Sequence, residues 1–354
     1  MNPLLDETHM FGSLFADPQI SGFFASERMI ERFTAFERCL ALALGDAGLV
    51  SAAEADGAVA AIDAFRPDLD QIRDRVTADG LPVPAFVAQL KASASRSVCG
   101  AIHRGATSQD LIDTAMVLGL RGANDIFASR IAAVIDGFKR LDTAFGRTEM
   151  MGRTRMQAAL PIRVSDRIAT WSLPMERHLE HLRSLRPQVE ALQFGGAVGN
   201  RSDLGGKGDA VAAAMAKRLG LANPPRAWHA MRETMADYAG WLSLVTGTIG
   251  KFGQDICLMA QQGVEEAALS GGGASSAMPH KQNPVLAELL VTYARFNATQ
   301  VVGMHHALIH EQERSGAAWT LEWMTLPLMV AATGKALLVA GELQGKIIRL
   351  GPAG

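Results

Sequence analysis

The chain has 354 residues, of which 48% are hydrophobic and 20% are charged, and its formal net charge at pH 7 is −2. This length predicts two or three domains around a sizeable core, and the apolar content argues against intrinsic disorder. A net charge near zero argues against nucleic acid as the main partner, because neutralising phosphate groups requires a basic surface.

The sequence lacks the usual features of membrane and secreted proteins. Its longest stretch without Asp, Glu, Lys or Arg runs from Phe296 to His310 and has 15 residues, whereas a membrane span needs roughly 20 apolar residues. The N-terminus has neither the basic start nor the apolar run of a signal peptide. The three cysteines, at positions 39, 99 and 257, show no disulfide framework or metal-ligand spacing. We therefore expect a cytoplasmic protein with no membrane partner and no metal.

The hydrophobic pattern predicts helices along almost the whole chain. In residues 27–44, apolar side chains recur at spacings of one, three and four, as one buried helical face requires. Elements between 67 and 99 look shorter, with a break at 81–84 that contains two prolines. Long helical segments are then predicted at about 108–145, 164–192, 231–269, 284–314 and 321–348.

These predictions give an all-α fold, a bundle of long helices. A helix of about 38 residues is roughly 57 Å long at 1.5 Å per residue, so it needs packing partners along its whole length. The sequence shows no Asn-Gly hairpin and no sustained alternation of apolar and polar residues, which are the usual signals of strands. We predict a smaller N-terminal helical domain (1–103) and a central long-helix bundle (104–354) that forms the oligomerisation core.

The glycine-rich loop before Pro284 is the first candidate site. Asn283 followed by Pro284 predicts a helix start with Asn283 as N-cap, and the free N–H groups there favour an anion. Lys281 adds a positive charge, and Ser275 and Ser276 follow a flexible lead-in. This combination suits holding a carboxylate while a serine oxygen approaches its α-carbon. Ordinary loop polarity is the alternative interpretation.

The segment 275–284, Ser-Ser-Ala-Met-Pro-His-Lys-Gln-Asn-Pro, resembles the signature of the fumarase/aspartase superfamily, with Ala274 in place of the usual glycine. Segments 103–110 and 152–161 resemble two further superfamily segments in the expected order. The resemblance spans nearly the whole chain and implies the long-helix bundle of that superfamily. Many relatives continue into another helical domain after the position of Gly354, so we expect that C-terminal domain to be absent or truncated.

One departure from the superfamily pattern is informative. Arg155 stands where the lyases that cleave argininosuccinate and adenylosuccinate carry a histidine general acid. Arginine stays protonated and cannot shuttle protons near neutral pH, so a lyase that must protonate a leaving nitrogen would be compromised. A carboxylate that attacks or leaves needs no such acid. The resemblance therefore favours the lactonising branch, the carboxymuconate cycloisomerases, which segments 192–199, 228–232 and 310–314 also resemble.

The resemblance implies a role for each motif residue. Ser275 would transfer the proton, and Lys281 and Asn283 would stabilise an aci-carboxylate intermediate. His103 would orient or polarise a substrate carboxylate. The residues expected to bind substrate are Thr107, Ser108, Arg153, Arg155, Gln157, Ser276, Met278, His310 and Arg314. Thr107 or Ser108 could also cap the following helix.

The implied activity is conversion of 3-carboxy-cis,cis-muconate, a small tricarboxylate, to a carboxymuconolactone without a cofactor. This reaction belongs to the protocatechuate branch of the beta-ketoadipate pathway. Two alternatives remain: a C–N lyase of the adenylosuccinate or argininosuccinate type that releases fumarate, and a non-catalytic helical scaffold. A single antiparallel bundle would scatter the three motif segments toward both its ends. The superfamily builds each site from segments of three chains, so the resemblance also implies a homotetramer with shared active sites.

Overall fold

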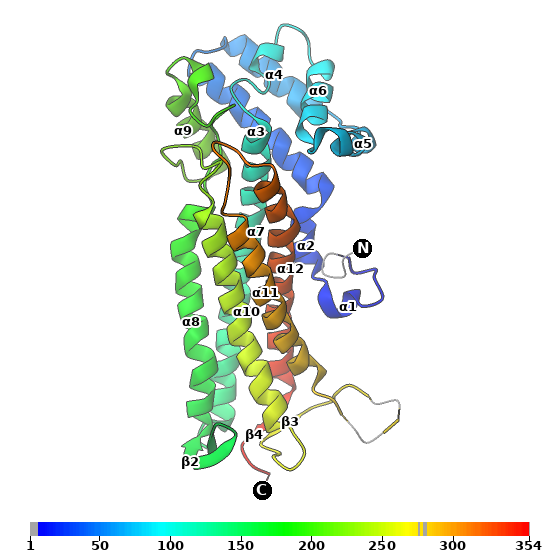
Figure 1. The fold of residues 1–354 in the computed structure, drawn as a ribbon, viewed down its shortest axis with the longest axis vertical. Coiled ribbons are helices and arrows are strands. Elements are labelled where there is room, and N and C mark those ends of the chain that lie inside the picture. Colours follow the sequence, from blue (N-terminus) through cyan, green and yellow to red (C-terminus); the bar gives the residue numbers. More distant parts are fainter. Residues whose placement is uncertain (1–5, 275–276, 279–281, 354) are drawn as a thin grey trace.

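The structure is a computed structural model that describes residues 6–274, 277–278 and 282–353, and it is an elongated helical bundle (Figure 1). Long helices run along its long axis and alternate in direction (Figure 1). They are α7 (Ser108–Phe145), α8 (Val164–Val189), α10 (Glu233–Met259), α11 (Val285–His306) and α12 (Ala317–Lys346). The predicted all-α fold is confirmed, and α7 has the bounds expected from the sequence.

The core of the bundle is built from apolar side chains at helical spacing. Phe138 of α7, Trp171 of α8 and Phe252 of α10 meet in it, and each is at most 1% exposed. The ring centroids of Phe138 and Phe252 lie 5.0 Å apart in an edge-to-face arrangement, which is favourable for aromatic pairs. This packing fixes the relative positions of α7, α8 and α10.

Shorter helices surround the end of the bundle at which α7 begins (Figure 1). They are α3 (Ser26–Asp46), α4 (Ala52–Ala64), α5 (Leu69–Asp79), α6 (Val83–Ser93) and α9 (Gly208–Leu219). Single turns complete the described helices: α1 (Gly12–Phe15), α2 (Pro18–Ser21), η1 (Gly22–Phe24), η2 (Cys99–Ala101) and η3 (Ser202–Leu204). The expected helix at 27–44 is α3, and α9, from the second half of the chain, packs against it. The domain boundary near residue 103 stays a prediction.

Two short antiparallel sheets lie at the opposite end. One is the hairpin of β1 (Glu149–Thr154) and β2 (Gln157–Arg163), and the other pairs β3 (Ala267–Leu269) with β4 (Ile347–Leu350). The hairpin departs from the helical prediction for this part of the chain, because its turn lacks the usual Asn-Gly signal. Arg155 and Met156 occupy that turn with φ values of 47° and 67°, a left-handed conformation that these residue types seldom adopt.

Two predicted helices end earlier than expected. The segment 231–269 forms α10 up to Met259 and then turns, with Gly263 and Glu265 at positive φ, into β3. The segment 284–314 is helical up to His306.

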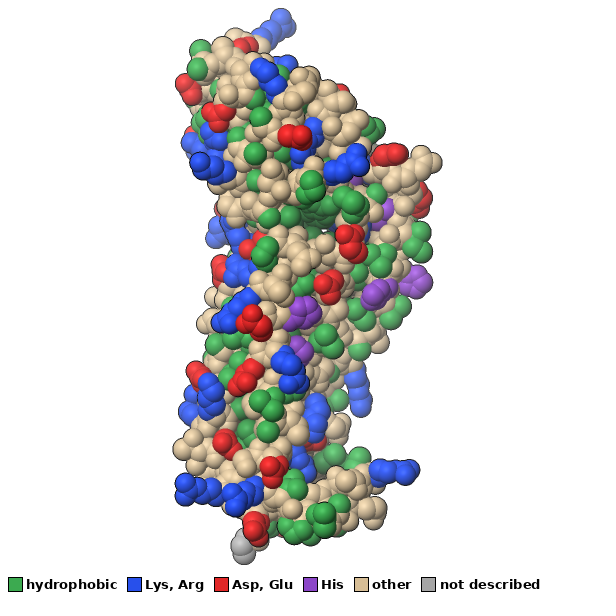
Figure 2. Space-filling view, turned by 90° about the vertical axis from the view of Figure 1, so that its left-hand side faces the viewer, with side chains coloured by type: hydrophobic (Ala, Val, Ile, Leu, Met, Phe, Trp, Pro, Cys, Tyr) green, Lys and Arg blue, Asp and Glu red, His purple; other side chains and the backbone are tan. Residues whose placement is uncertain are grey.

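Helix α12 is long and apolar enough to cross a membrane by length and composition, but 72% of its apolar window is buried inside the bundle. It is therefore a core helix of this fold. Figure 2 shows that one long face of the molecule carries both signs of charge, with apolar side chains between them.

Candidate active site

The three motif segments lie at opposite ends of the bundle (Figure 1). Segment 103–110 leads into α7 beside α3, whereas segment 152–161 is the hairpin at the far end. The described part of segment 275–283 lies at the hairpin end too (Figure 1). The 38 residues of α7 span roughly 57 Å, so the segments of one chain cannot surround one small molecule.

His103 is held by a buried carboxylate on α3. Its backbone N–H donates to Oε2 of Glu37 at 2.8 Å, and its Nδ1 lies 2.6 Å from Oε1 of Glu37. The Glu37 side chain is fully buried, and that of His103 is 16% exposed. The carboxylate therefore fixes the ring orientation and favours the tautomer with the proton on Nδ1. Glu37 was missed, although a charged residue on the apolar face of 27–44 was a signal for it.

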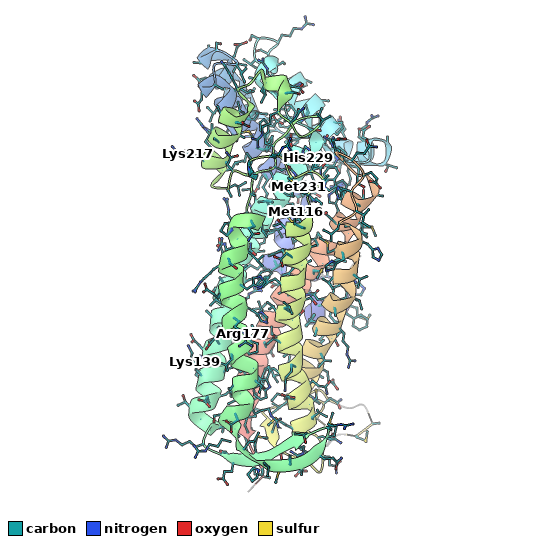
Figure 3. All side chains as sticks on the ribbon, turned by 60° about the vertical axis from the view of Figure 1, so that its left-hand side comes forward. Met116, Lys139, Arg177, Lys217, His229 and Met231 are labelled. Carbon is teal, nitrogen blue, oxygen red and sulfur yellow. The ribbon has the colours of Figure 1, made fainter. Side chains whose placement is uncertain are left out.

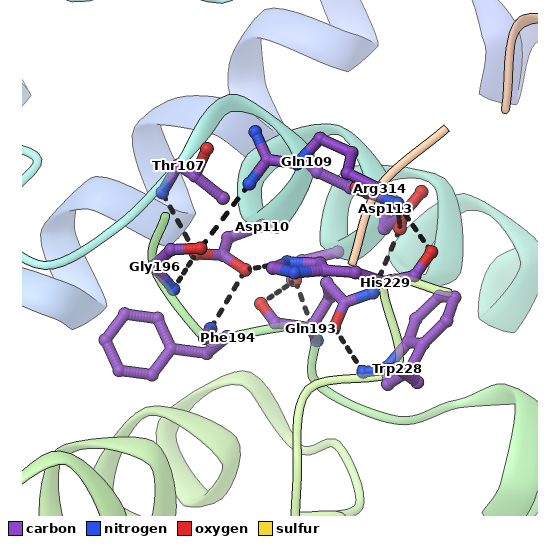
Figure 4. Close-up of polar contacts among 12 residues, drawn as sticks. Thr107, Gln109, Asp110, Asp113, Gln193, Phe194, Gly196, Trp228, His229 and Arg314 are labelled. Atoms are coloured by element: carbon purple, nitrogen blue, oxygen red, sulfur yellow. Dashed lines mark hydrogen bonds and ion pairs between the residues drawn. The ribbon is translucent and has the colours of Figure 1, made fainter. Parts of the chain in front are cut away.

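Asp110, in the first turn of α7, organises the loops around it. Its fully buried carboxylate accepts bonds from the N–H groups of Thr107, Gly195 and Gly196 at 2.9 to 3.0 Å, and from Nε2 of His229 at 2.7 Å (Figure 4). Thr107 is the N-cap residue of α7, and Ser108 is the first residue of that helix. The glycine-rich segment that begins at Phe194 is thus wrapped around a buried charge.

Glycine is required in that segment. A Cβ on Gly195 would lie 2.4 Å from Cβ of Ala227 and 2.7 Å from Cα of Gly199. Gly196 has a φ of +70°, which glycine adopts without steric cost. The close backbone packing at these two glycines brings the N–H groups of Gly195 and Gly196 within hydrogen-bond distance of the Asp110 carboxylate.

A second buried cluster lies one helical turn further along α7. Asp113 accepts bonds from Arg232 at 2.7 Å, Trp319 at 2.9 Å and Gln193 at 3.0 Å. Arg232 also pairs with Glu322 and lies 4.6 Å from the ring centroid of Trp228. His229 and Met231 lie at the same end of the bundle as Met116 of α7 (Figure 3).

The charge of Arg232 is retained despite its burial. Burial alone would lower the pKa of the guanidinium, but the carboxylates of Asp113 and Glu322 outweigh it and raise that pKa above its ordinary value. Arg232 is the one cation shared by these two carboxylates, so removing it would leave two buried carboxylates without their counter-charge.

Of the expected substrate-binding residues, His310 and Arg314 lie beside this cluster. The His310 side chain is 1% exposed, and its Nε2 lies 3.7 Å from Oε1 of Glu322. Arg314 is exposed and donates to the carbonyl of Ala197 at 2.9 Å. The structure thus brings His103, Thr107, Ser108, His310 and Arg314 to one end, with His310 buried in the protein.

The hairpin carries the other arginines. Arg153 donates from Nη1 to Oε1 of Glu266 at 2.6 Å, so its guanidinium is engaged by a buried carboxylate. Arg155 lies on the turn and Gln157 begins β2. A pocket of about 410 Å³ lies beside the hairpin, and both Arg153 and Arg155 line it.

Asn283 closes the stem of the signature loop. Its N–H donates to the carbonyl of Gly273 at 3.0 Å, and the N–H of Gly273 donates back at 2.9 Å. The expectation that Asn283 caps the next helix is wrong by one position, because Pro284 is the N-cap and makes no side-chain cap bond. The bridge to Gly273 holds Asn283 in extended pairing before α11.

Ser275, Ser276 and Lys281 lie outside the described residues. Met278 is described and is 42% exposed. Among the described residues, no group of three or more His, Cys, Asp or Glu side chains is placed to hold a metal ion.

Comparisons with known proteins agree with this arrangement. A family model described as "Lyase" matches residues 18–303. The 3-carboxy-cis,cis-muconate cycloisomerase of Pseudomonas putida is 33% identical over 351 residues, covering 96% of this chain and 83% of that protein. N-acetyl-S-(2-succino)cysteine lyase of Dickeya dadantii is 30% identical over 326 residues, covering 90% of this chain and 70% of that protein.

A solved structure is similar along nearly the whole chain. The crystal structure of the 3-carboxy-cis,cis-muconate lactonizing enzyme from Pseudomonas putida has a TM-score of 0.88 and 32% sequence identity, covering 97% of this chain and 77% of that chain. Family match, sequence identity and fold agree. The chain therefore belongs to the lyase family and, with it, to the fumarase/aspartase superfamily of enzymes.

Proposed function

We propose that the chain is a cofactor-independent cycloisomerase that converts 3-carboxy-cis,cis-muconate to a carboxymuconolactone. The observation that carries the proposal is Arg155, on the hairpin turn and in the wall of a pocket rich in cations. A C–N lyase needs a proton donor at this position by resemblance, and a guanidinium cannot supply one. It can, however, bind a carboxylate, which is the group that reacts in lactonisation.

In the proposed reaction, a substrate carboxylate oxygen forms a C–O bond to one carbon of a double bond. The π electron pair of the double bond moves to the neighbouring carbon, and the adjoining carboxylate takes up its charge as an aci-carboxylate. The neighbouring carbon then accepts a proton. The lactone is thus an isomer of the substrate acid. Because the intermediate carries an extra negative charge, preorganised cations and N–H donors supply most of the stabilisation.

We assign the proton transfer to Ser275, activated by Lys281 and by the positive end of the helix that begins at Val285. Lys281 and Asn283 stabilise the intermediate, and His103, oriented by Glu37, polarises a carboxylate. The assigned substrate-binding residues are Thr107, Ser108, Arg153, Arg155, Gln157, Ser276, Met278, His310 and Arg314.

We further propose a homotetramer in which each site takes segments from three chains. The motif segments of one chain lie at opposite ends of its bundle, which supports this assembly. A site with all three segments then has to combine the two kinds of end from different chains. Exposed apolar side chains on four long helices also support it, since such residues favour burial in an interface. They are Leu173, Leu244, Val302 and Met324, each between 49% and 67% exposed.

Shared sites can be tested by mixing two inactive variants. Arg153→Ala alters the hairpin segment and Ser275→Ala alters the signature loop. After subunit exchange, some tetramers would contain a site with all native segments, so part of the activity should return. An active monomer by light scattering, or no recovery after proven exchange, would rule out the shared-site assembly.

The proposed cellular context is the cytoplasm and the protocatechuate branch of the beta-ketoadipate pathway. The burial of α12 inside the bundle supports a protein that needs no membrane. The activities for which its relatives are named support a substrate of the carboxymuconate class.

The rival activity is a lyase, which the name of the Dickeya dadantii relative illustrates. A purified-protein assay separates the candidates by offering 3-carboxy-cis,cis-muconate, adenylosuccinate and argininosuccinate in turn. Loss of muconate absorbance without fumarate supports the cycloisomerase. Fumarate release would show a lyase, and no reaction with any of the three would favour the scaffold.

A further inference from the structure

The pocket beside the hairpin has a charge imbalance that the motif residues do not account for. It is lined by residues from the hairpin, from α8, and from α10 and the loop after it. Its charged lining consists of four cations and two carboxylates: Arg153, Arg155, Arg167, Lys251, Asp255 and Glu266. The pocket therefore carries two more positive than negative side chains.

Both carboxylates are already occupied. Glu266 binds Arg153 at 2.6 Å. Asp255 pairs with Lys251 on the same helix and accepts a bond from Nε1 of Trp171 at 2.7 Å. Neither carboxylate is therefore left to neutralise the other two arginines.

Arg155 and Arg167 are the two cations left over. Within residues 6–274, 277–278 and 282–353, neither has an ion-pair partner. Arg167 is the fourth residue of α8, where the positive end of the helix dipole makes a cation unfavourable. An anion bound there would therefore interact favourably both with Arg167 and with the helix dipole.

We propose that Arg167 is a substrate-anchoring residue, and that Arg155 and Arg167 together hold two carboxylates of one polycarboxylate ligand. The guanidinium fork matches a carboxylate with two parallel hydrogen bonds. A volume of about 410 Å³ is within the range of small-molecule pockets. The substrate identity rests on the proposed function, whereas the preference for a polycarboxylate is argued from the two guanidinium groups that have no ion-pair partner among the described residues.

The test measures binding without turnover. Calorimetry with propane-1,2,3-tricarboxylate and with inorganic phosphate compares the native protein, Arg167→Gln and a control, Arg177→Gln. Arg177 lies on the same helix, is exposed and does not line the pocket (Figure 3). Arg167→Gln should weaken tricarboxylate binding at least about tenfold, the scale of a lost charge-assisted hydrogen bond, and Arg177→Gln should change it less than about twofold.

Two results would overturn the proposal. Equal effects of the two variants would show that Arg167 contributes only general surface charge. An equal loss of phosphate and tricarboxylate binding would show a non-selective anion site. Should Arg167→Gln fail to fold, Arg167→Lys takes its place, because it keeps the charge but loses the planar fork and should still weaken the tricarboxylate more than phosphate.

These results are separable from the proposed function. If the protein forms no lactone but Arg167→Gln weakens tricarboxylate binding, the anchoring role of Arg167 stands and the cycloisomerase activity is refuted. If the protein forms the lactone but Arg167→Gln changes neither KM nor tricarboxylate binding, the cycloisomerase activity stands and the anchoring role of Arg167 is refuted.

Discussion

The imidazole of His229 and the carboxylate of Asp110 are 119 residues apart in the sequence, yet Nε2 of His229 lies 2.7 Å from Oδ1 of Asp110. Both side chains are buried. This contact joins the first turn of α7 to the segment before α10 and so fixes one half of the candidate site. The carboxylate accepts three further backbone N–H bonds, which makes it the centre of that end of the bundle.

Asp110→Asn should therefore destabilise the protein. The amide replaces one acceptor oxygen by a donor, so at least one buried N–H group loses its partner. We expect the free energy of unfolding to fall by about 2–4 kcal/mol, measured by urea denaturation. Asp136→Asn, on an exposed pair of the same helix, should change it by less than about 0.5 kcal/mol. Equal losses in the two variants would contradict the role given to Asp110.

Arg155→Leu should act on substrate binding. If Arg155 anchors a carboxylate, KM should rise about 10–100-fold with a smaller change in kcat, the scale of a lost charged hydrogen bond. Steady-state kinetics with 3-carboxy-cis,cis-muconate measures the effect. An unchanged KM would show that Arg155 points away from the substrate.

Ser275→Ala should act on the chemical step. Loss of a proton-transfer group lowers kcat by at least about 10², and the circular dichroism spectrum should stay the same. Ser276→Ala is the comparison variant, because it removes the neighbouring hydroxyl, which is assigned to substrate binding and not to proton transfer, and it should lower kcat less. A larger loss in Ser276→Ala would move the proton transfer to that residue.

The pH dependence of stability should contain a contribution from His178. Burial first, and then the positive charges at His181 and Arg177, lower the pKa of His178 to about 4. Because the unfolded chain binds a proton near pH 6.5 and the folded chain does not, stability is lost as the pH falls from about 6.5 to about 4.

His178→Gln isolates the contribution of His178 to this pH dependence, because glutamine does not titrate but keeps a polar group near Thr248. The hydroxyl of Thr248 lies 2.8 Å from Nε2 of His178. Thermal melts between pH 7 and 4 should show a shallower loss of stability in the variant than in the native protein. Parallel pH profiles would contradict the assignment.

The sequence was sufficient to predict the long helices, because their stability comes from apolar faces with a regular period. The bounds of α7 follow from such a pattern together with Thr107 at its N-cap. The hairpin could not be predicted in the same way, since Arg155 and Met156 adopt left-handed backbone angles that their residue types disfavour. Its conformation depends on strand pairing and on contacts such as that of Arg153 with Glu266.

The motif segments of the candidate site could be predicted from the sequence, but the hydrogen bonds and ion pairs that connect them could not. The partners in these contacts lie far apart in the sequence, as do Glu37 and His103, which are 66 positions apart. A buried charge on an apolar helical face predicts that some partner exists but does not identify that partner. The sharing of Arg232 between Asp113 and Glu322 depends in the same way on three different helical regions meeting.

The most direct test of the account is the identity of the product formed in D₂O. Purified protein is incubated with 3-carboxy-cis,cis-muconate, and the product is examined by NMR and mass spectrometry. Ring closure followed by protonation of the neighbouring carbon predicts a carboxymuconolactone with one carbon-bound deuterium. Unchanged substrate under conditions in which the protein is folded, or fumarate released from a C–N lyase substrate instead, would contradict the cycloisomerase.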